Sequence, residues 1–486
     1  MKKSVLAISI AMMGMLGACA TMEGGSGEDI GRATMPANDG WAAAEGAVTG
    51  GSAAKPENDF TVTTRKELFD AVAKAGSAPS IIRIKGTINL SSDDSGRELT
   101  EKDYAVAPYN FDEYMKTYAP AKWNQKLEKG RPDRSLDGPQ EEARLASVKK
   151  QRAQVTLKLA SNTTLVGVGS DAKLVKGNVW IGPEAENVII RNIAFEDAFD
   201  YFPGWDPGDS FKIDKSYPGC QDAYVDAGTG PQKCPGGRWN SEYDSISVNG
   251  GKRVWIDHNS FNDGNRPDKL FPPVYPFPHN EVTQKVQHHD GMIDVTNGAN
   301  YVTVSYNVFK DHDKAMLIGG SDSSKLDPNK LKVTIHNNFF DNVGQRAPRV
   351  RFGQVHVYNN YFVGDAAGND DPKLSAYENH LAVIKAKGDN NIFRQALGAG
   401  KDSAIYSEGN LFEIKNGGQA QAVGNMGGKV FFDAGSVVNG QPLKLDVSKP
   451  LSADVGWKPT LYGNNAVRPA AEVPAHVKAH AGPGKL

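Results

Sequence analysis

The 486-residue sequence has only three cysteines, almost no net charge and few long apolar segments. With a formal net charge of −2 it has no overall basic field, so a polyanionic ligand would have to be held by local cations or by a metal ion. Beyond the N-terminus, no apolar run is long enough to span a membrane. These absences argue against a nucleic-acid-binding protein and against a protein with several membrane spans.

Residues 1–18 have the features of a bacterial export signal. Lys2 and Lys3 precede a short apolar stretch that ends in Leu16-Gly-Ala-Cys19. This ending resembles the box at which lipoprotein signals are cut, which would make Cys19 the lipidated first residue of the mature protein; ordinary signal cleavage is the alternative. Ala20, rather than Asp, follows Cys19, which is similar to lipoproteins sent to the outer membrane. We therefore expect an exported protein, either secreted or anchored through Cys19 in the outer membrane of a Gram-negative cell envelope.

The two remaining cysteines, Cys220 and Cys234, lie in one Gly-, Pro- and Asp-rich loop. In an exported protein this pattern favours a disulfide over two free thiols. Closing a loop of about 15 residues contributes roughly 3 kcal/mol in the chain-entropy model.

Composition divides the mature chain into two parts. Residues 19–37 are rich in Gly, Ser and Ala without apolar periodicity, which predicts a flexible tether. The folded domain is expected to span residues 38–486, a length that a single layered core rarely supports.

Repetition resolves this difficulty. Six segments share two alternating aliphatic residues followed by an asparagine and a closing phenylalanine; they begin at Glu186, Lys252, Asn300, Leu331, Gly353 and Ser403. Alternating Val and Ile form strands that face one side, and the closing phenylalanines are as little as 22 residues apart. The sequence therefore predicts an all-β, single-domain, right-handed parallel β-helix, in which stacked asparagines form an amide ladder.

Two stretches are predicted to be helical. Thr64-Arg-Lys-Glu67 has capping-box spacing and leads into an apolar stripe that ends at Ala75, so it should cap the open end of the solenoid. Residues 109–152 are rich in Lys, Glu, Arg, Ala and Tyr and lack the repeat, so we interpret them as a helical insertion.

Three aspartates can converge on one face of such a solenoid. Asp290 and Asp294 are four residues apart in His-His-Asp-Gly-Met-Ile-Asp, and Asp244 begins the preceding coil. Hard oxygen donors without cysteine suit Ca²⁺ better than zinc or copper. Glu242 shares the face of Asp244 and is a candidate fourth ligand. Considered alone, such aspartates are more often solvated surface residues.

Basic residues follow at intervals of about one coil. Lys314 is 20 residues beyond Asp294, and Arg346 is 32 beyond Lys314, which places Arg346 about 10 Å from the carboxylates. Pro348 should interrupt the strand, so that Arg346 and Arg351 can reach one groove. Arg349 is expected to be structural or to neighbour the substrate.

The string His-His-Asp-Gly-Met-Ile-Asp, together with Val-Trp-Ile-Asp-His258 and Arg346-Ala-Pro-Arg-Val-Arg351, resembles strings of parallel β-helix pectate lyases, most closely the secreted Bacillus-type enzymes. The resemblance extends from about Asn38 to Leu486. The resemblance implies that Asp244, Asp290 and Asp294 bind Ca²⁺, that Arg346 is the base, and that Lys314 and Arg351 hold the substrate. The chain departs from the family at the cysteine loop, residues 208–237, and at the lipobox.

The implied activity is calcium-dependent β-elimination of polygalacturonate, a (1,4)-α-D-galacturonan, which gives 4,5-unsaturated oligogalacturonates. An arginine base, normally always charged, would favour an alkaline optimum. We expect a monomer whose only membrane contact is the anchor. A polygalacturonase would instead use paired acids, a pectin lyase would not need Asp290 and Asp294, and a binding-only solenoid would be expected to lose Arg346 or a calcium ligand.

Overall fold

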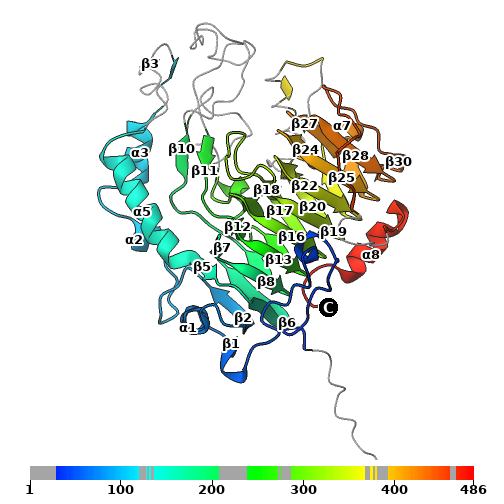
Figure 1. Ribbon diagram of the computed structural model, residues 1–486. Coiled ribbons are helices and arrows are strands. Elements are labelled where there is room, and N and C mark those ends of the chain that lie inside the picture. The colour runs from blue at the N-terminus through cyan, green and yellow to red at the C-terminus, as the bar shows by residue number, and fades with distance from the viewer. Residues whose placement is uncertain are drawn as a thin grey trace, which may run out of the picture.

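The structure, a computed structural model, describes residues 29–119, 127–128, 131–132, 136–206, 238–271, 275, 286–366, 373–375, 378–379, 382, 392–459 and 467–486. The described strands form three parallel ladders that follow one long axis (Figure 1). Within a ladder, neighbouring strands come from successive coils of the chain. This arrangement confirms the right-handed parallel β-helix expected from the repeats.

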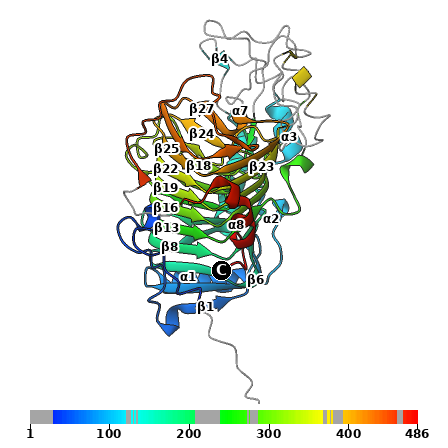
Figure 2. The same cartoon turned by 90° about the vertical axis from the view of Figure 1, so that its right-hand side faces the viewer.

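The first ladder contains the strands predicted from the repeats. Their aliphatic residues alternate, so that one set faces the interior, as Val254 and Ile256 do with no exposed surface. Figure 2 shows these strands stacked one above another. The ladder runs through β1 (Asp59–Val62), β2 (Ser80–Asn89), β6 (Thr163–Val175), β8 (Glu186–Arg191), β13 (Lys252–Asp257), β16 (Asn300–Ser305), β19 (Lys332–His336), β22 (Gln354–Tyr358), β25 (Ala404–Glu408) and β28 (Val430–Ala434).

The second ladder begins with the ends of β2 and β6 and carries the closing phenylalanines. Neighbouring rings stack with centroids 4.5–5.1 Å apart from Phe195 to Phe412. Its other strands are β9 (Ala194–Glu196), β14 (Ser260–Asn262), β17 (Val308–Lys314), β20 (Phe339–Gln345), β23 (Tyr361–Asp365), β26 (Leu411–Lys415) and β29 (Val437–Val438), and β30 (Gln441–Pro442) pairs antiparallel with the last.

The predicted amide ladder lies where the chain passes from the first ladder to the second. Each Nδ2 donates to the next Oδ1 at 2.9–3.1 Å through the fully buried residues Asn259, Asn307, Asn338, Asn360 and Asn410. Ile193, which stands in place of asparagine in the first repeat, ends the row, since its backbone N–H donates to Asn259 Oδ1. Each amide also satisfies a backbone carbonyl, so the row fixes the register of the coils.

The third ladder carries Asp294 and Arg349. It consists of short strands, each of which alternates buried aliphatic residues with residues on the outer face. The strands are β5 (Thr156–Leu159), β7 (Asn178–Ile181), β12 (Ile246–Asn249), β15 (Ile293–Thr296), β18 (Met316–Ile318), β21 (Arg349–Val350), β24 (Leu397–Gly400) and β27 (Val423–Met426).

The capping helix is confirmed as α1 (Arg65–Ala75). Thr64 and Glu67 form the predicted capping box, and Leu68, Ala71 and Ala75 are buried. The helix lies beside β1 and β2 at the first coil (Figure 1), where its apolar side chains join the main core.

The insertion is helical as predicted, although it also contains a short antiparallel pair. Its helices are α3 (Phe111–Thr117) and α5 (Pro139–Val155), which ends three residues beyond the predicted bound, and β3 (Leu127–Glu128) pairs with β4 (Arg131–Pro132). The short helix α2 (Glu101–Tyr104) comes just before the predicted insertion. A separate aromatic core, which includes Tyr114, Phe202 and Trp239, holds these helices against β10 (Gly204–Asp206) and β11 (Arg238–Asn240). The insertion therefore builds a wall beside the third ladder. Among the described residues, further helices are α7 (Gln419–Ala422), α8 (Val473–His480) and the 3-10 turns Trp41–Ala43, Pro56–Asn58, Asp268–Leu270 and Ala470–Glu472.

The tether predicted for residues 19–37 is too long. Asp29 pairs with Arg83 at 2.8 Å, and Met35 is buried with backbone hydrogen bonds to Val48, so residues 29–37 pack on the solenoid. The Gly-, Ser- and Ala-rich composition gave no sign of this packing, because the few contacts that hold the segment on the solenoid leave no periodic pattern in the sequence. The lipobox with Cys19, and the loop 208–237 with Cys220 and Cys234, lie outside the described residues. In the described part, no helix is long and apolar enough to cross a membrane.

Candidate functional site

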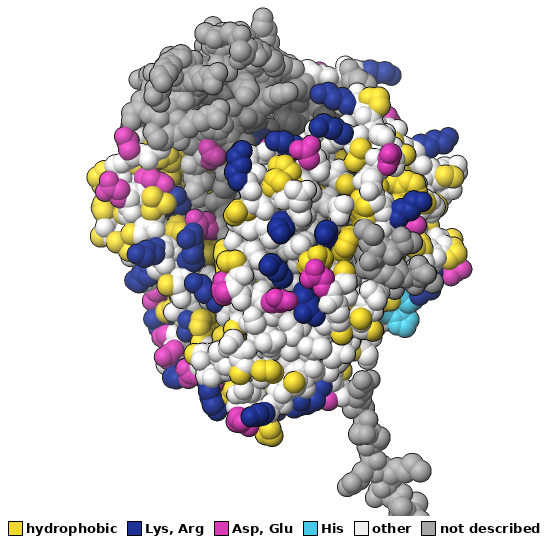
Figure 3. All heavy atoms as spheres, in the orientation of Figure 1, with side chains coloured by type: hydrophobic (Ala, Val, Ile, Leu, Met, Phe, Trp, Pro, Cys, Tyr) yellow, Lys and Arg dark blue, Asp and Glu magenta, His cyan; other side chains and the backbone are white. Residues whose placement is uncertain are grey.

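The outer face of the third ladder aligns one residue from each successive strand. Asp294 of β15 pairs with Ser247 of β12 on one side and Leu317 of β18 on the other, and Leu317 pairs with Arg349 of β21. Adjacent strands are about 4.8 Å apart, so Asp294 and Arg349 lie about 10 Å apart along the axis. Lys and Arg side chains gather near the middle of the face seen in Figure 3, with acidic side chains beside them.

The carboxylates of Asp244 and Asp294 converge around Gly291. A Cβ added to Gly291 would lie 2.7 Å from Asp294 Oδ1 and 2.8 Å from Asp244 Oδ1, so the two oxygens cannot be farther apart than the sum of those distances. The Gly291 N–H donates to Asp244 Oδ1, and Ser247 donates to Asp244 Oδ2 at 2.7 Å. The Leu317 N–H donates to Asp294 Oδ1 at 3.1 Å.

This grouping perturbs the acids electrostatically. Burial, followed by the charge of Asp290, raises the pKa of Asp244 to about 7. Burial and the charges of Asp244 and Asp290 raise the pKa of Asp294 well above its usual value, whereas Arg346 acts in the opposite direction. The three carboxylates therefore share one field, and a cation placed among them would favour their ionised forms.

Lys314 ends β17 next to this cluster. Its ammonium donates to Asp290 Oδ1 at 2.6 Å and to Gln287 Oε1 at 3.1 Å, and little of the side chain is exposed. His312, two residues earlier, fixes the same loop because its Nε2 lies 2.7 Å from the Asp290 carbonyl oxygen. The structure therefore places Lys314 directly against Asp290 of the carboxylate cluster.

The arginines follow on the next coil. β20 ends at Gln345 and β21 begins at Arg349, so the chain breaks at Pro348 as predicted. Arg346 lies in that break with φ 56°, and its carbonyl accepts from the Met316 N–H at 2.7 Å. Among the described residues, neither Arg346 Nε nor Arg349 Nε has a hydrogen-bond partner although both are buried.

Arg349 belongs to the cationic group more closely than expected. Burial and the charges of Arg351 and Arg346 lower the pKa of Arg349 to about 10, which places all three guanidinium groups in one field. Arg351 is oriented by Asp322, which accepts from its Nε at 2.6 Å, and by the Gly319 carbonyl oxygen. The i, i+2 spacing of Arg349 and Arg351 was the sequence signal, because it puts both on one strand face.

Glu242 is placed differently from the three aspartates. Its carboxylate forms an ion pair with Arg152 of α5, and its backbone N–H donates to Asp200. Its role as a fourth metal ligand stays a prediction.

The residues present fit a hard cation, although no group of three or more His, Cys, Asp or Glu is already arranged as a metal site within the described ranges. Asp244, Asp290 and Asp294 offer carboxylate oxygens, the ligands that Ca²⁺ prefers. The space between Asp244 and Asp294 exists because Gly291 has no side chain to fill it. Sequence reasoning missed Gly291, Gln287 and Ser247; the only signal was their position beside the acids.

Comparisons with known proteins show which family the whole chain resembles. A family model described as pectate lyase matches residues 3–112 and 135–486. A pectate lyase of Bacillus subtilis (strain 168) is 40% identical over 100% of both chains, and pectate lyase A of Dickeya chrysanthemi is 31% identical over 92% of this chain and 88% of its own. A solved pectate lyase bound to hexasaccharide has a TM-score of 0.78 and 40% identity, covering 94% of this chain and 100% of its own. A solved pectate lyase from Acidovorax avenae subsp citrulli has a TM-score of 0.78 and 33% identity, covering 96% of this chain and 99% of its own.

Proposed function

The chain belongs to the pectate lyase family and is a polysaccharide lyase, and on that premise we propose that it cleaves polygalacturonate by calcium-dependent β-elimination to 4,5-unsaturated products. The observation that carries the proposal is the juxtaposition of the carboxylate cluster with Lys314 and the three arginines, on the outer face of the third ladder and in the loops beside it. An acidic polymer needs such local positive charge because the chain as a whole is not basic.

Asp244, Asp290 and Asp294 would hold the Ca²⁺. When bound, the ion supplies positive charge that offsets the uronate carboxylate and makes the adjacent C5 proton more acidic. The raised pKa of Asp244 and the proximity of the carboxylates support a cation-binding role, since uncompensated acids repel one another.

Arg346 is proposed as the base that removes the C5 proton. Its buried Nε and its position one coil beyond Lys314 support this role. Arg351, held by Asp322, and Lys314 would bind substrate carboxylates and fix the sugar so that C5–H faces the guanidinium. The electrons of the C5–H bond then form the C4–C5 double bond as the C4–O bond breaks, and water is the expected proton donor to the departing oxygen.

One assay tests the reaction class. Purified protein is incubated with polygalacturonate, and ultraviolet absorbance of the conjugated product is followed with and without a chelator. We expect absorbance that the chelator abolishes and added Ca²⁺ restores. New reducing ends without ultraviolet absorbance would show that the reaction is hydrolysis. Absorbance that persists with the chelator would show that the reaction does not need calcium.

We further propose that the protein is an exported monomer, with Cys19 lipidated and Cys220 joined to Cys234. The lipobox and the N-terminal basic and apolar segments support export. Mass spectrometry of the mature protein tests both points. A mature N-terminus without lipid would refute the lipid anchor at Cys19. Alkylation of both Cys220 and Cys234 without prior reduction would refute the disulfide.

A further inference from the structure

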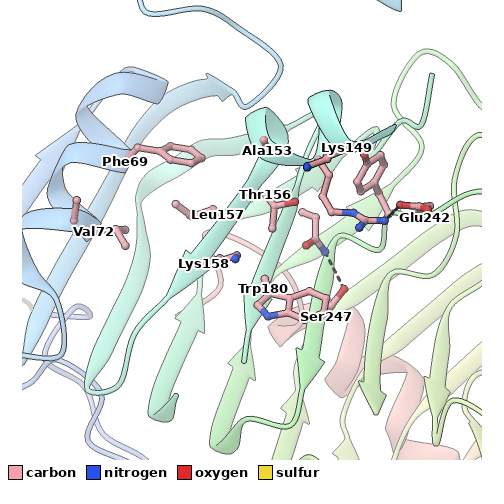
Figure 4. A pocket seen from close by; sticks show the side chains of 14 residues that line it. Phe69, Val72, Lys149, Ala153, Thr156, Leu157, Lys158, Trp180, Glu242 and Ser247 are labelled. Atoms are coloured by element: carbon pink, nitrogen blue, oxygen red, sulfur yellow. Dashed lines mark hydrogen bonds and ion pairs between the residues drawn. The ribbon is translucent and has the colours of Figure 1, made fainter. Parts of the chain in front are cut away.

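A cavity of about 700 Å³ lies beside the candidate site, between α1, α5 and the outer face of the third ladder. We call it the α1–α5 pocket. Figure 4 shows Phe69 and Val72 on one side, Lys149 and Glu242 on the other, and Trp180 and Lys158 from the ladder between them.

The α1–α5 pocket adjoins the carboxylate cluster. Ser247 lines the pocket and donates to Asp244 Oδ2 at 2.7 Å. Asn178, also in the lining, donates to the Asp244 carbonyl oxygen at 2.8 Å. The two sites therefore share a wall.

Register aligns the pocket with the candidate site. Lys158 pairs with Trp180, Trp180 with Ser247, and Ser247 with Asp294, all on the outer face of the ladder. Two strand separations put Trp180 about 10 Å from Asp294, and a third puts Lys158 about 14 Å away. A polymer that follows the ladder from Asp294, away from Arg349, would reach this pocket.

The lining suits one sugar of an acidic polysaccharide. The partly exposed Trp180 offers an aromatic face, and Phe69 extends the apolar surface, which matches the C–H face of a pyranose ring. Lys149 and Lys158 are exposed and can pair with a carboxylate, whereas the charge of Arg152 is already offset by Glu242.

We propose that the α1–α5 pocket is a distal subsite that binds a uronate residue of the same polymer chain, with Trp180 as stacking platform and Lys158 as carboxylate partner. The inference rests on the proposed function. It predicts that the protein favours long chains over short ones for a reason located away from Arg346.

The test measures kcat/KM for polygalacturonate and for the galacturonate trisaccharide, and uses the ratio of the first value to the second. Trp180→Ala should lower the ratio of the two about tenfold, because an aromatic contact and its buried area are lost on the long substrate. Trp180→Phe should restore most of the ratio. Lys158→Gln should lower it about two- to fivefold, and less at high salt. Lys252→Gln, which makes the same charge change at an exposed site on the first ladder, is the matched control.

The outcomes separate the two proposals. If the unmodified protein gives no unsaturated product, the proposed function and the subsite both fall. If it does, an unchanged ratio in Trp180→Ala overturns the subsite alone. Equal losses on both substrates, or a melting temperature that falls with activity, would give Trp180 a structural role and also overturn it.

Discussion

Gly291→Ala is the substitution that addresses the proposed calcium site most directly. It adds one methyl group, changes no charge, and affects a residue whose backbone does not require glycine, since its φ is not in the left-handed region. The new Cβ would lie 2.7 Å from Asp294 Oδ1 and 2.8 Å from Asp244 Oδ1. Ordinary contact begins near 3.4 Å, so each oxygen would have to retreat by about 0.6–0.7 Å.

That displacement is large for a metal site. Ca²⁺ ligands lie at about 2.3–2.6 Å, a range narrower than the required retreat. Asp244 is held by Ser247 and by the Gly291 N–H, so moving it would also strain two hydrogen bonds. Disturbing the groups that orient ligands typically lowers metal affinity 10- to 100-fold. We therefore expect a loss of about 1.4–2.7 kcal/mol in calcium binding.

Isothermal titration of the metal-free protein with CaCl₂ measures this loss without any turnover. Gly418→Ala is the matched control, because a Cβ there would meet no atom within 4 Å and its φ of −173° suits any residue. Unchanged affinity in Gly291→Ala, with Gly418→Ala also normal, would refute the placement of calcium between Asp244 and Asp294. A parallel melting curve without calcium should show both variants folded.

Three further predictions follow from the same contacts. Arg346→Lys keeps the charge near Asp294 but removes the proposed base, so kcat should fall about 10²- to 10⁴-fold while calorimetric calcium affinity is kept; a small loss would argue against Arg346 as base. Asn338→Ala removes a fully buried amide that donates to the Val304 and His336 carbonyl oxygens and to Asn360, and should cost about 3–5 kcal/mol of unfolding free energy in urea. The control Asn425→Ala removes a partly exposed amide with two hydrogen bonds on the edge strand β27 and should cost only about 1 kcal/mol. Burial lowers the pKa of His336 to about 3, below its unfolded value of about 6.5. The unfolding free energy should therefore be highest above pH 6.5 and decline by up to about 1.4 kcal/mol per pH unit as the pH falls toward 3, and His336→Gln should flatten that decline.

The fold was predictable because each residue type in the repeat has one structural role at a fixed position. An asparagine at a fixed distance from a phenylalanine can satisfy carbonyls of its own and the neighbouring coil, and Asn307 does so at 2.9–3.0 Å. Alternating Val and Ile then set which face is inside. Such local patterns do not depend on what the loops between coils do, so variable insertions left the signal intact.

The site was predictable in part. The coil spacing implied that Lys314 lies about one coil beyond Asp294, but its direct ion pair with Asp290 was not predicted, because Asp290 lies in the loop before β15. The ion pair of Glu242 was not predictable because it depends on how α5 packs. The neighbours of Arg349 were not predictable because the short strands of the third ladder carry no sequence repeat that would set their register. The packing of Met35 was missed for the same reason: one buried side chain in a Gly-rich segment carries no periodicity.

Strands and loops divide the work in this molecule. Residues on strand faces, such as Trp180, Asp294 and Arg349, are spaced by the fixed separation of about 4.8 Å between coils, so they form a straight row. Asp244, Asp290 and Arg346 lie just outside strands and escape that spacing, which lets like charges approach one another and opposite charges converge. A row with regular steps suits recognition of a polymer, whereas a converging loop cluster suits a metal ion and a reacting bond. Changes at Trp180 or Lys158 should therefore alter chain-length preference, whereas changes at Asp244, Asp290 or Asp294 should alter calcium affinity. A change at Arg346 should alter kcat.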